Sequence, residues 1–387
     1  MERAERFYFD NAATSFPKPA EVYEAMDRCA REAGGNAGRG AHDLSLTGSR
    51  LLSSLRHELA ALIGGDPNLV VLTKNATEAI NIVLLGLLKR GATVAHGPLE
   101  HNAVMRPLSH LMTNEKVRLV EVPGDAQGRI APDTLRRTLA EQHVDLVVTL
   151  HCSNVHGLAQ DLDGLAEVCR RRRVPLVVDA AQSAGALPID MEGMRIDALC
   201  LTGHKGLFGP TGTGALVLGA DIADRIPPLL YGGTGSVSER ENMPDFLPDR
   251  LEAGTPNTCG AAGLLAGVGY LARRTVADVA GYETELRQRM LERLRSIDGL
   301  RLLGDVPGPA VATVSFTAPL LPGDLAHLLQ QQYGVAVRAG LHCAPRAHRT
   351  LGTMPAGALR LAPGPLTPLD AVDEVTDAIA RIVSALA

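Results

Sequence analysis

The stretch "DALCLTGHKGLFGPTGTGALVLG", residues 197–219, joins a buried strand to an unusual loop. Residues 198–201 are continuously apolar, which is typical of a strand covered on both faces. The apolar run ends at Thr202, and His204 and Lys205 follow, ahead of a glycine-rich segment. Most lysines are solvated surface charges. At the end of a buried strand and beside such a loop, Lys205 is also a candidate nucleophile at a cofactor site.

Further apolar runs on both sides of this stretch alternate with helical segments. With it, seven runs are strand candidates, at residues 69–73, 92–96, 117–122, 144–151, 174–180, 198–202 and 214–219. This alternation predicts an α/β fold with one large, mostly parallel, seven-stranded sheet. After residue 254, two helices, shorter strands at 311–317, 335–340 and 358–362, and a last helix predict a smaller α+β domain. We expect the large domain over 15–255 and the small domain over 256–387 together with 1–14.

The composition excludes several classes of protein. The 387 residues carry a net charge of -5, without the basic excess of a nucleic-acid-binding protein. The N-terminus lacks the apolar segment of a signal peptide, and no window reaches the length of a membrane span. The six cysteines form no CxxC pair, so neither a metal site nor a disulfide framework is expected. These features predict a cytoplasmic protein with no metal, no nucleic-acid partner and no membrane partner.

Polar residues follow five of the predicted strands, at the edge of an open α/β sheet where ligands bind. Each could be structural, as a helix cap or a hydrogen-bonded core residue. Their common position at one edge favours a site instead. They are Asn75, Ala76 and Thr77; Glu100 and His101; His151 and Asn154; Asp179 and Gln182; and Thr202, His204 and Lys205.

One kind of chemistry unites these residues, that of an amine-reactive aldehyde cofactor carrying a phosphate. A lysine forms the Schiff base, and a carboxylate keeps a pyridine nitrogen protonated so that the ring accepts electrons. Lys205 and Asp179 supply these two parts. A helix N-terminus with hydroxyl and imidazole donors holds a phosphate, and the residues around Thr77 supply such a terminus.

The motifs of the chain resemble those of the cysteine desulfurase and selenocysteine lyase family, pyridoxal-phosphate enzymes with the class V aminotransferase fold. The resemblance extends over nearly the whole chain. It rests on "YFDNAAT", "GRGAHDLS", "NATEAIN", "EHNA", "SNVHG", "VVDAAQSAG", "TGHKGLFGPTG", "EAGTPN", "VRAGLHCAP" and "ALRLAPGPLTPLDAVDEV". It implies the pyridoxal-phosphate transferase fold of type I.

The resemblance also implies a role for each matching cofactor residue. Lys205 is the Schiff-base lysine, Asp179 the partner of the pyridine nitrogen, and His101 a catalytic residue that stacks on the ring. Asn154 and Gln182 lie beside the phenolic oxygen. The phosphate cup is made by Ala76, Thr77, Thr202 and His204. Thr255 matches a threonine that reaches the phosphate of a neighbouring subunit, which implies a homodimer.

Cys343 matches the persulfide-forming cysteine of the family. Positive neighbours stabilise a thiolate, and five basic residues surround it in the sequence: Arg338, His342, Arg346, His348 and Arg349. The substrate pocket is implied by Arg360, which matches the arginine that binds the substrate carboxylate, and by Asn11, Ala13 and His42.

The implied reaction is conversion of L-cysteine to L-alanine, with transfer of the sulfur as a persulfide to an acceptor protein. It serves sulfur mobilisation, as in iron–sulfur cluster assembly. A selenocysteine lyase acting on L-selenocysteine remains an alternative, and Leu341 and Ala362 depart from the family pattern and leave the subtype open. Cys343 argues against transamination or epimerisation, whereas Lys205 and Asp179 argue against a non-catalytic binding protein.

Overall fold

The computed structural model describes residues 7–38, 40 and 42–385. Its large sheet has seven strands in the order β2-β8-β7-β6-β5-β3-β4, and β8 alone is antiparallel to its neighbours. The strands are β2 (Val70–Thr73), β3 (Thr93–His96), β4 (Arg118–Glu121), β5 (Leu146–Leu150), β6 (Leu176–Asp179), β7 (Ala198–Thr202) and β8 (Gly214–Leu218). The predicted mostly parallel sheet is therefore confirmed, strand by strand.

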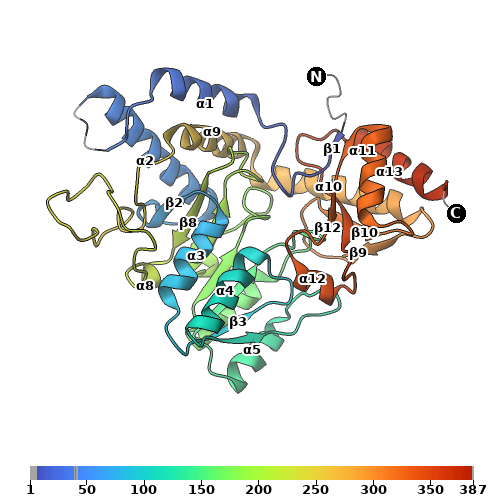
Figure 1. The fold of residues 1–387 in the computed structure, drawn as a ribbon, viewed down its shortest axis with the longest axis horizontal. Coiled ribbons are helices and arrows are strands. Elements are labelled where there is room, and N and C mark those ends of the chain that lie inside the picture. Colours follow the sequence, from blue (N-terminus) through green and yellow to red (C-terminus); the bar gives the residue numbers. More distant parts are fainter. Residues whose placement is uncertain (1–6, 39, 41, 386–387) are drawn as a thin grey trace.

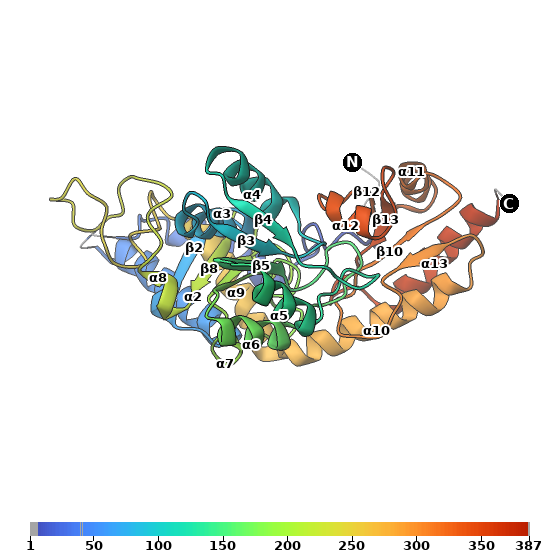
Figure 2. The same cartoon turned by 90° about the horizontal axis from the view of Figure 1, so that it is seen from below.

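Helices cover both faces of this sheet, which explains why its strands are continuously apolar (Figures 1 and 2). The helices of this region are α1 (Ala20–Glu32), α2 (Asp43–Ile63), α3 (Ala76–Leu87), α4 (Asn102–Asn114), α5 (Pro132–Glu141), α6 (Leu162–Arg172), α7 (Met191–Met194), α8 (Ala220–Ala223) and α9 (Thr258–Arg274). Apolar residues of α3 and α4 pack on one face of the sheet. Those of α2, α5, α6 and α9 pack on the other. Alternate residues of each strand enter the two cores.

The small domain is built on a four-stranded antiparallel sheet in the order β12-β13-β10-β9. Its elements are α10 (Val276–Arg295), β9 (Arg301–Leu303), β10 (Val314–Thr317), α11 (Pro322–Tyr333), β12 (Arg338–Gly340), α12 (Pro345–Thr350), β13 (Ala358–Leu361) and α13 (Leu369–Ser384). Beside this sheet, β1 (Phe7–Tyr8) pairs in parallel with β11 (Val335–Ala336). The single strand expected at 335–340 is thus two short strands in two different sheets.

The packing corrects the expected domain boundary after residue 255. Leu264 and Val268 of α9 belong to the core beneath the large sheet, and α9 packs against α1 and α2. Phe9, in contrast, belongs to the core of the small domain, as expected for the N-terminal segment. The change from one core to the other falls within α10, between Val279 and Leu286. Figure 2 shows α10 running beneath both domains.

This arrangement places the carboxyl ends of the central strands beside the small domain. At the edge where the chain leaves β5, β6 and β7, Asn154, Asp179 and Thr202 line one cavity together with Arg338 and His342 of the small domain. Loops from both domains can therefore meet around one cavity. In the described part of the chain, no helix combines the length and apolar character that crossing a membrane requires.

Candidate active site

A cavity of about 260 Å³ lies between the two domains, at the carboxyl ends of the strands of the large sheet. It brings together most of the residues singled out in the sequence. Those among its lining are Ala13, Asn75, Ala76, Thr77, His101, Asn154, Asp179, Gln182, Thr202, His204, Lys205, Arg338, His342, Cys343 and Arg360. Of the residues singled out in the sequence, the lining of a larger groove of about 1050 Å³, beside α5 and α6, contains His151.

Lys205 and Asp179 follow neighbouring strands of the sheet. Asp179 ends β6, only 5% of it is exposed, and its Oδ1 accepts a hydrogen bond from the Ala181 N–H (2.9 Å). The loops that follow β6 and β7 are in backbone contact at Gly185 and Gly206. A Cβ on Gly185 (φ +80°) would lie only 2.4 Å from the carbonyl oxygen of Gly206. Burial lowers the pKa of Lys205 to about 8, although the Asp179 charge opposes this shift. Part of Lys205 is therefore a neutral amine near neutral pH, as a nucleophile must be.

An anion-binding cup faces Lys205 at the start of α3. Asn75 caps this helix, with its Oδ1 accepting from the Glu78 N–H (3.0 Å), and Ala76 and Thr77 form the first turn. Oγ1 of Thr202 and Nδ1 of His204 are buried and have no hydrogen-bond partner among the residues that the structure describes. A helix N-terminus attracts anions, and buried polar atoms without partners are costly unless a ligand satisfies them. These residues therefore fit a bound phosphate group.

His101 presents a fixed ring to the same cavity. It is the N-cap of α4, and its Nδ1 accepts from the Ala103 N–H (3.0 Å), which leaves Nε2 to carry the proton of the neutral ring. Burial lowers its pKa, and the charges of Lys205 and Arg106 act in the same direction, whereas that of Asp179 opposes them. The neutral ring suits a stacking role over a flat cofactor.

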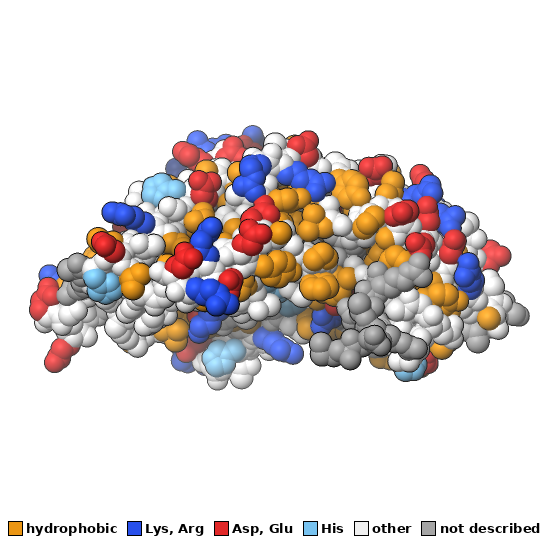
Figure 3. Space-filling view, turned by 90° about the horizontal axis from the view of Figure 1, so that it is seen from above, with side chains coloured by type: hydrophobic (Ala, Val, Ile, Leu, Met, Phe, Trp, Pro, Cys, Tyr) orange, Lys and Arg blue, Asp and Glu red, His pale blue; other side chains and the backbone are white. Residues whose placement is uncertain are grey.

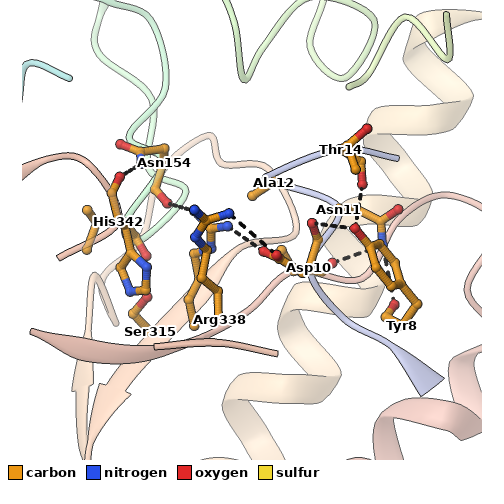
Figure 4. A network of polar contacts seen from close by, with 12 residues as sticks. Tyr8, Asp10, Asn11, Ala12, Thr14, Asn154, Ser315, Arg338 and His342 are labelled. Carbon is orange, nitrogen blue, oxygen red and sulfur yellow. Dashed lines mark hydrogen bonds and ion pairs between the residues drawn. The ribbon is translucent and has the colours of Figure 1, made fainter. Parts of the chain in front are cut away.

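Arg360 is paired with the carboxylate of Asp10, which was not among the predicted site residues. The arginine is 2% exposed. Its Nη2 donates to Oδ1 of Asp10 (2.6 Å), its Nη1 donates to the carbonyl oxygen of Asn154 (2.9 Å), and its Nε has no partner in the described part of the chain. Nη1 of Arg338 lies 3.6 Å from the other Asp10 oxygen (Figure 4). The guanidinium is therefore oriented while N–H groups remain for a ligand. The only sequence signal for Asp10 was its position in "YFDNAAT", beside Asn11.

Cys343 is exposed on a loop held by the large domain. The Asn102 N–H donates to the Cys343 carbonyl oxygen (2.8 Å), and Nδ2 of Asn154 donates to that of His342 (2.7 Å). Both His342 (φ 48°) and Cys343 (φ 56°) have left-handed backbone conformations, which cost energy in residues other than glycine. The loop thus has a defined shape that places the thiol on the cavity.

The expected positive surroundings of Cys343 need correction. Burial lowers the pKa of His342 to about 2 and that of His348 to about 4, so both rings are neutral at pH 7. Arg346 pairs with Glu121, and Arg338 faces Asp10. The sequence could not reveal this, because it shows neither burial nor partners from distant segments. Exposure at the cavity, rather than a positive environment, therefore distinguishes Cys343 from the other cysteines. By contrast, burial raises the pKa of the Cys29, Cys152, Cys169 and Cys200 thiols.

Thr255, His42 and Asn11 do not line this cavity, and neither do Glu100 and His151 of the strand-end set. Thr255 is exposed and lines a separate groove with residues of α2 and β2. His42 is exposed and caps α2, with its Nδ1 accepting from the Ser45 N–H (3.3 Å). Asn11 donates to the carbonyl oxygen of Ala362 (3.0 Å) and lines a small adjoining cavity beside Lys205.

The fold and the site together define an α/β enzyme of the pyridoxal-phosphate fold type I. Residues 7–375 match the model of the family Aminotransferase class-V, and the chain belongs to that family. It is 34% identical over 352 residues to a probable cysteine desulfurase of Pyrococcus abyssi, covering 88% of this chain and 85% of that protein. It is 33% identical over 383 residues to a cysteine desulfurase of Haloferax volcanii, covering 96% and 88%.

Solved structures show the same relationship. The apo cysteine desulfurase from Thermococcus onnurineus superposes with a TM-score of 0.91 and 32% identity, over 98% of this chain and 95% of that one. A cysteine desulfurase from Escherichia coli, in an S-sulfonic acid form, gives a TM-score of 0.87 and 27% identity, over 98% and 94%.

Proposed function

We propose that this protein is a pyridoxal-phosphate-dependent cysteine desulfurase, which converts L-cysteine to L-alanine and holds the sulfur as a persulfide on Cys343. One observation carries the proposal. The exposed Cys343 lines the same cavity as Lys205 and Arg360, so an amine nucleophile, a carboxylate-binding group and a sulfur nucleophile face one substrate. Relatives named cysteine desulfurase support it over most of the chain.

When bound, pyridoxal phosphate supplies an aldehyde for amines and a ring that accepts electrons. The residues of this chain bind and orient it. The cup of Ala76, Thr77, Thr202 and His204 would hold its phosphate, and the buried Asp179 carboxylate would favour a protonated ring nitrogen. His101 would stack on the ring, and Asn154 and Gln182 would bind its phenolic oxygen.

Arg360 and Lys205 act on the substrate. The free Nε–H of Arg360, with the remaining hydrogens on its other nitrogens, binds the substrate carboxylate. With its pKa lowered to about 8, Nζ of Lys205 can take up a proton and return it near neutral pH. Ala13 lies on the lining as well and limits the space beside the bound substrate.

Cys343 performs the step that is specific to sulfur. Its thiolate attacks Sγ of the substrate, so that a sulfur–sulfur bond forms and the Cβ–Sγ bond breaks. The electron pair of that bond remains on the substrate, and Cβ takes up a proton, which yields alanine. The substrate sulfur is oxidised to the persulfide level while Cβ is reduced, so no external oxidant or reductant is needed.

We further propose a homodimer, a sulfur-acceptor protein and a cytoplasmic location. Thr255 is exposed on this chain and is free to reach a neighbouring subunit. The loop of residues 232–250 extends away from the large domain (Figure 1), and apolar side chains gather near the middle of the face shown in Figure 3. Exposed apolar patches mark interfaces. Free cysteines at all six positions suit a reducing compartment.

The test compares Cys343→Ala with the matched variant Cys259→Ala, since Cys259 is partly exposed but lies outside the cavity. After incubation with L-cysteine, mass spectrometry locates any added sulfur atom, and an alanine assay follows turnover. We expect the adduct on Cys343 in the wild type and in the control, and neither adduct nor alanine with Cys343→Ala. Undiminished alanine release from that variant rules out the proposal. Activity retained only with L-selenocysteine identifies a selenocysteine lyase instead.

A further inference from the structure

Cys343 lies on the border between two cavities. One is the cavity that holds Lys205. The other is a groove of about 480 Å³ between α3 and α4, which we call the α3–α4 groove. The groove is lined by Thr77, Asn81, Leu85, His101, Asn102, Ala103, Arg106, Pro107, His110 and Cys343. Thr77, His101, Ala103 and Cys343 line both. A sulfur atom on Cys343 is therefore accessible from the substrate side and from the groove.

One side of the α3–α4 groove is a straight row of side chains. Thr77, Asn81 and Leu85 lie at every fourth position of α3 and so form one line along that helix. At a rise of about 1.5 Å per residue, this line is roughly 12 Å long. An extended peptide of about four residues spans such a length. The shape of the groove thus suits a segment of a protein chain better than a compact small molecule.

The charge of the groove favours an anionic occupant. Arg106 is exposed, and in the described residues it makes no hydrogen bond or ion pair. No aspartate or glutamate is among the residues that line the groove. Glu121, whose partner Arg346 follows Cys343 by three residues, is already paired with that arginine. A negatively charged segment placed here would find an unpaired cation and no like charge in the lining.

We propose that the α3–α4 groove is where the sulfur acceptor binds, and that its occupant is an acidic, cysteine-bearing segment of the acceptor protein. The inference rests on the proposed desulfurase function and deepens it. The acceptor thiolate attacks the outer sulfur of the Cys343 persulfide. A new sulfur–sulfur bond forms on the acceptor, the bond to Cys343 breaks, and Cys343 leaves as a thiolate. One thiol proton passes from acceptor to Cys343 overall, and no oxidant or reductant is consumed.

The experiment separates loading of Cys343 from its discharge. Holoenzyme is loaded with L-cysteine, excess substrate is removed, and the persulfide content is measured by mass spectrometry. Three acetylated and amidated tetrapeptide probes with one cysteine, flanked by aspartate, serine or lysine, are then added separately. Discharge rates are expressed per loaded enzyme, so any difference in loading cancels. Mercaptosuccinate, a small anionic thiol, is the fourth probe.

The variants are Arg106→Glu and the matched control Arg118→Glu. Arg118 is also exposed, but it begins β4 at the amino end of the strand, whereas Cys343 lies at the carboxyl ends of the strands, and it is not among the residues that line the groove. With Arg106→Glu we expect discharge by the aspartate peptide to fall about fivefold, the upper range for one exposed ion pair, and discharge by the lysine peptide to rise. Arg118→Glu should keep the wild-type preference. Added salt should slow the aspartate peptide with the wild-type enzyme.

Each other outcome overturns a different statement. Normal loading with the same peptide preference in Arg106→Glu and the wild type overturns this inference alone. A stronger dependence on Arg106 for mercaptosuccinate than for the aspartate peptide shows a small-molecule acceptor and overturns the peptide segment. Failure of the wild type to form any persulfide on Cys343 overturns the proposed function, and this inference with it.

Discussion

The pair formed by Asp10 and Arg360 gives the sharpest test of how the site is built. Arg360 is 2% exposed, Asp10 has 19% of its side chain exposed, and the nitrogen–oxygen distance is 2.6 Å. Removing one partner of a buried ion pair costs about 3–5 kcal/mol, because the other charge stays buried without compensation. Asp10 is partly exposed, so we expect the lower end of that range, about 3 kcal/mol, for Asp10→Ala.

This loss can be converted into a shift of the melting temperature. An unfolding entropy of about 2.1 cal/mol/K per residue gives roughly 0.8 kcal/mol/K for a chain of 387 residues. A loss of about 3 kcal/mol therefore lowers the Tm by about 4 °C. Asp10→Asn keeps a hydrogen-bond acceptor and should therefore lose less stability than Asp10→Ala. The KM for L-cysteine should rise more than kcat falls, because Arg360 is no longer held in one orientation.

Circular dichroism during heating measures the first effect, and initial rates of alanine release measure the second. The control is Asp27→Ala, which breaks the exposed pair of Arg31 and Asp27, whose side chains are 74% and 62% exposed. Asp27→Ala should lower the free energy of unfolding by less than about 1 kcal/mol. Equal melting temperatures for Asp10→Ala and Asp27→Ala would refute the view that Asp10 compensates a buried charge. An unchanged KM in Asp10→Ala would refute its orienting role.

Three further predictions concern Lys205, Asp179 and Glu100. Burial lowers the Lys205 pKa to about 8, so cofactor-free enzyme should react with pyridoxal phosphate faster as the pH rises through that value. An absorbance time course that does not change between roughly pH 6 and 9 would contradict this prediction. The turnover rate of Asp179→Asn should fall on the order of a hundredfold or more, with an unchanged circular dichroism spectrum. Turnover at the wild-type rate would show that Asp179 has only a structural role. Burial, and secondarily the Asp179 charge, raise the pKa of Glu100 from 4.5 to about 8. Glu100 therefore contributes stability that is present below pH 4.5 and is lost as the pH rises to about 8. Glu100→Gln should accordingly gain stability over the wild type progressively between those pH values, and parallel pH–stability curves for the two proteins would exclude this.

The sequence predicted what depends on local pattern. The continuous apolar runs identified all seven strands of the large sheet, because strands buried on both faces have no polar positions. The strand-end residues Asp179, Thr202 and Lys205 could be placed at one edge, since parallel strands bring their carboxyl ends together. The short strands β1 and β9 were missed, because two or three residues carry no periodic signal.

The sequence could not predict features that depend on contacts between distant segments. His342 and His348 were interpreted as cations, but burial makes them neutral. Asp10 was overlooked because its partner lies 350 positions away in the chain. The predicted boundary after residue 255 assigned α9 to the small domain, whereas its Leu264 and Val268 pack in the core beneath the large sheet. In each case the missing information was the identity of the neighbour.

Asn154 shows how the two domains act as one site. It follows β5 in the large domain, yet both of its contacts reach the small domain. Its carbonyl oxygen accepts from Nη1 of Arg360, while its Nδ2 donates to the carbonyl oxygen of His342 (Figure 4). Asn154 thus connects both Arg360, which Asp10 also holds, and the loop of Cys343, which Asn102 also holds, to the large domain. Among the described residues, Oδ1 of Asn154 is buried without a partner, so its side chain can still bind a ligand in the cavity. Under the proposed function, these contacts would position the groups that bind substrate and cofactor and the Cys343 thiol relative to one another.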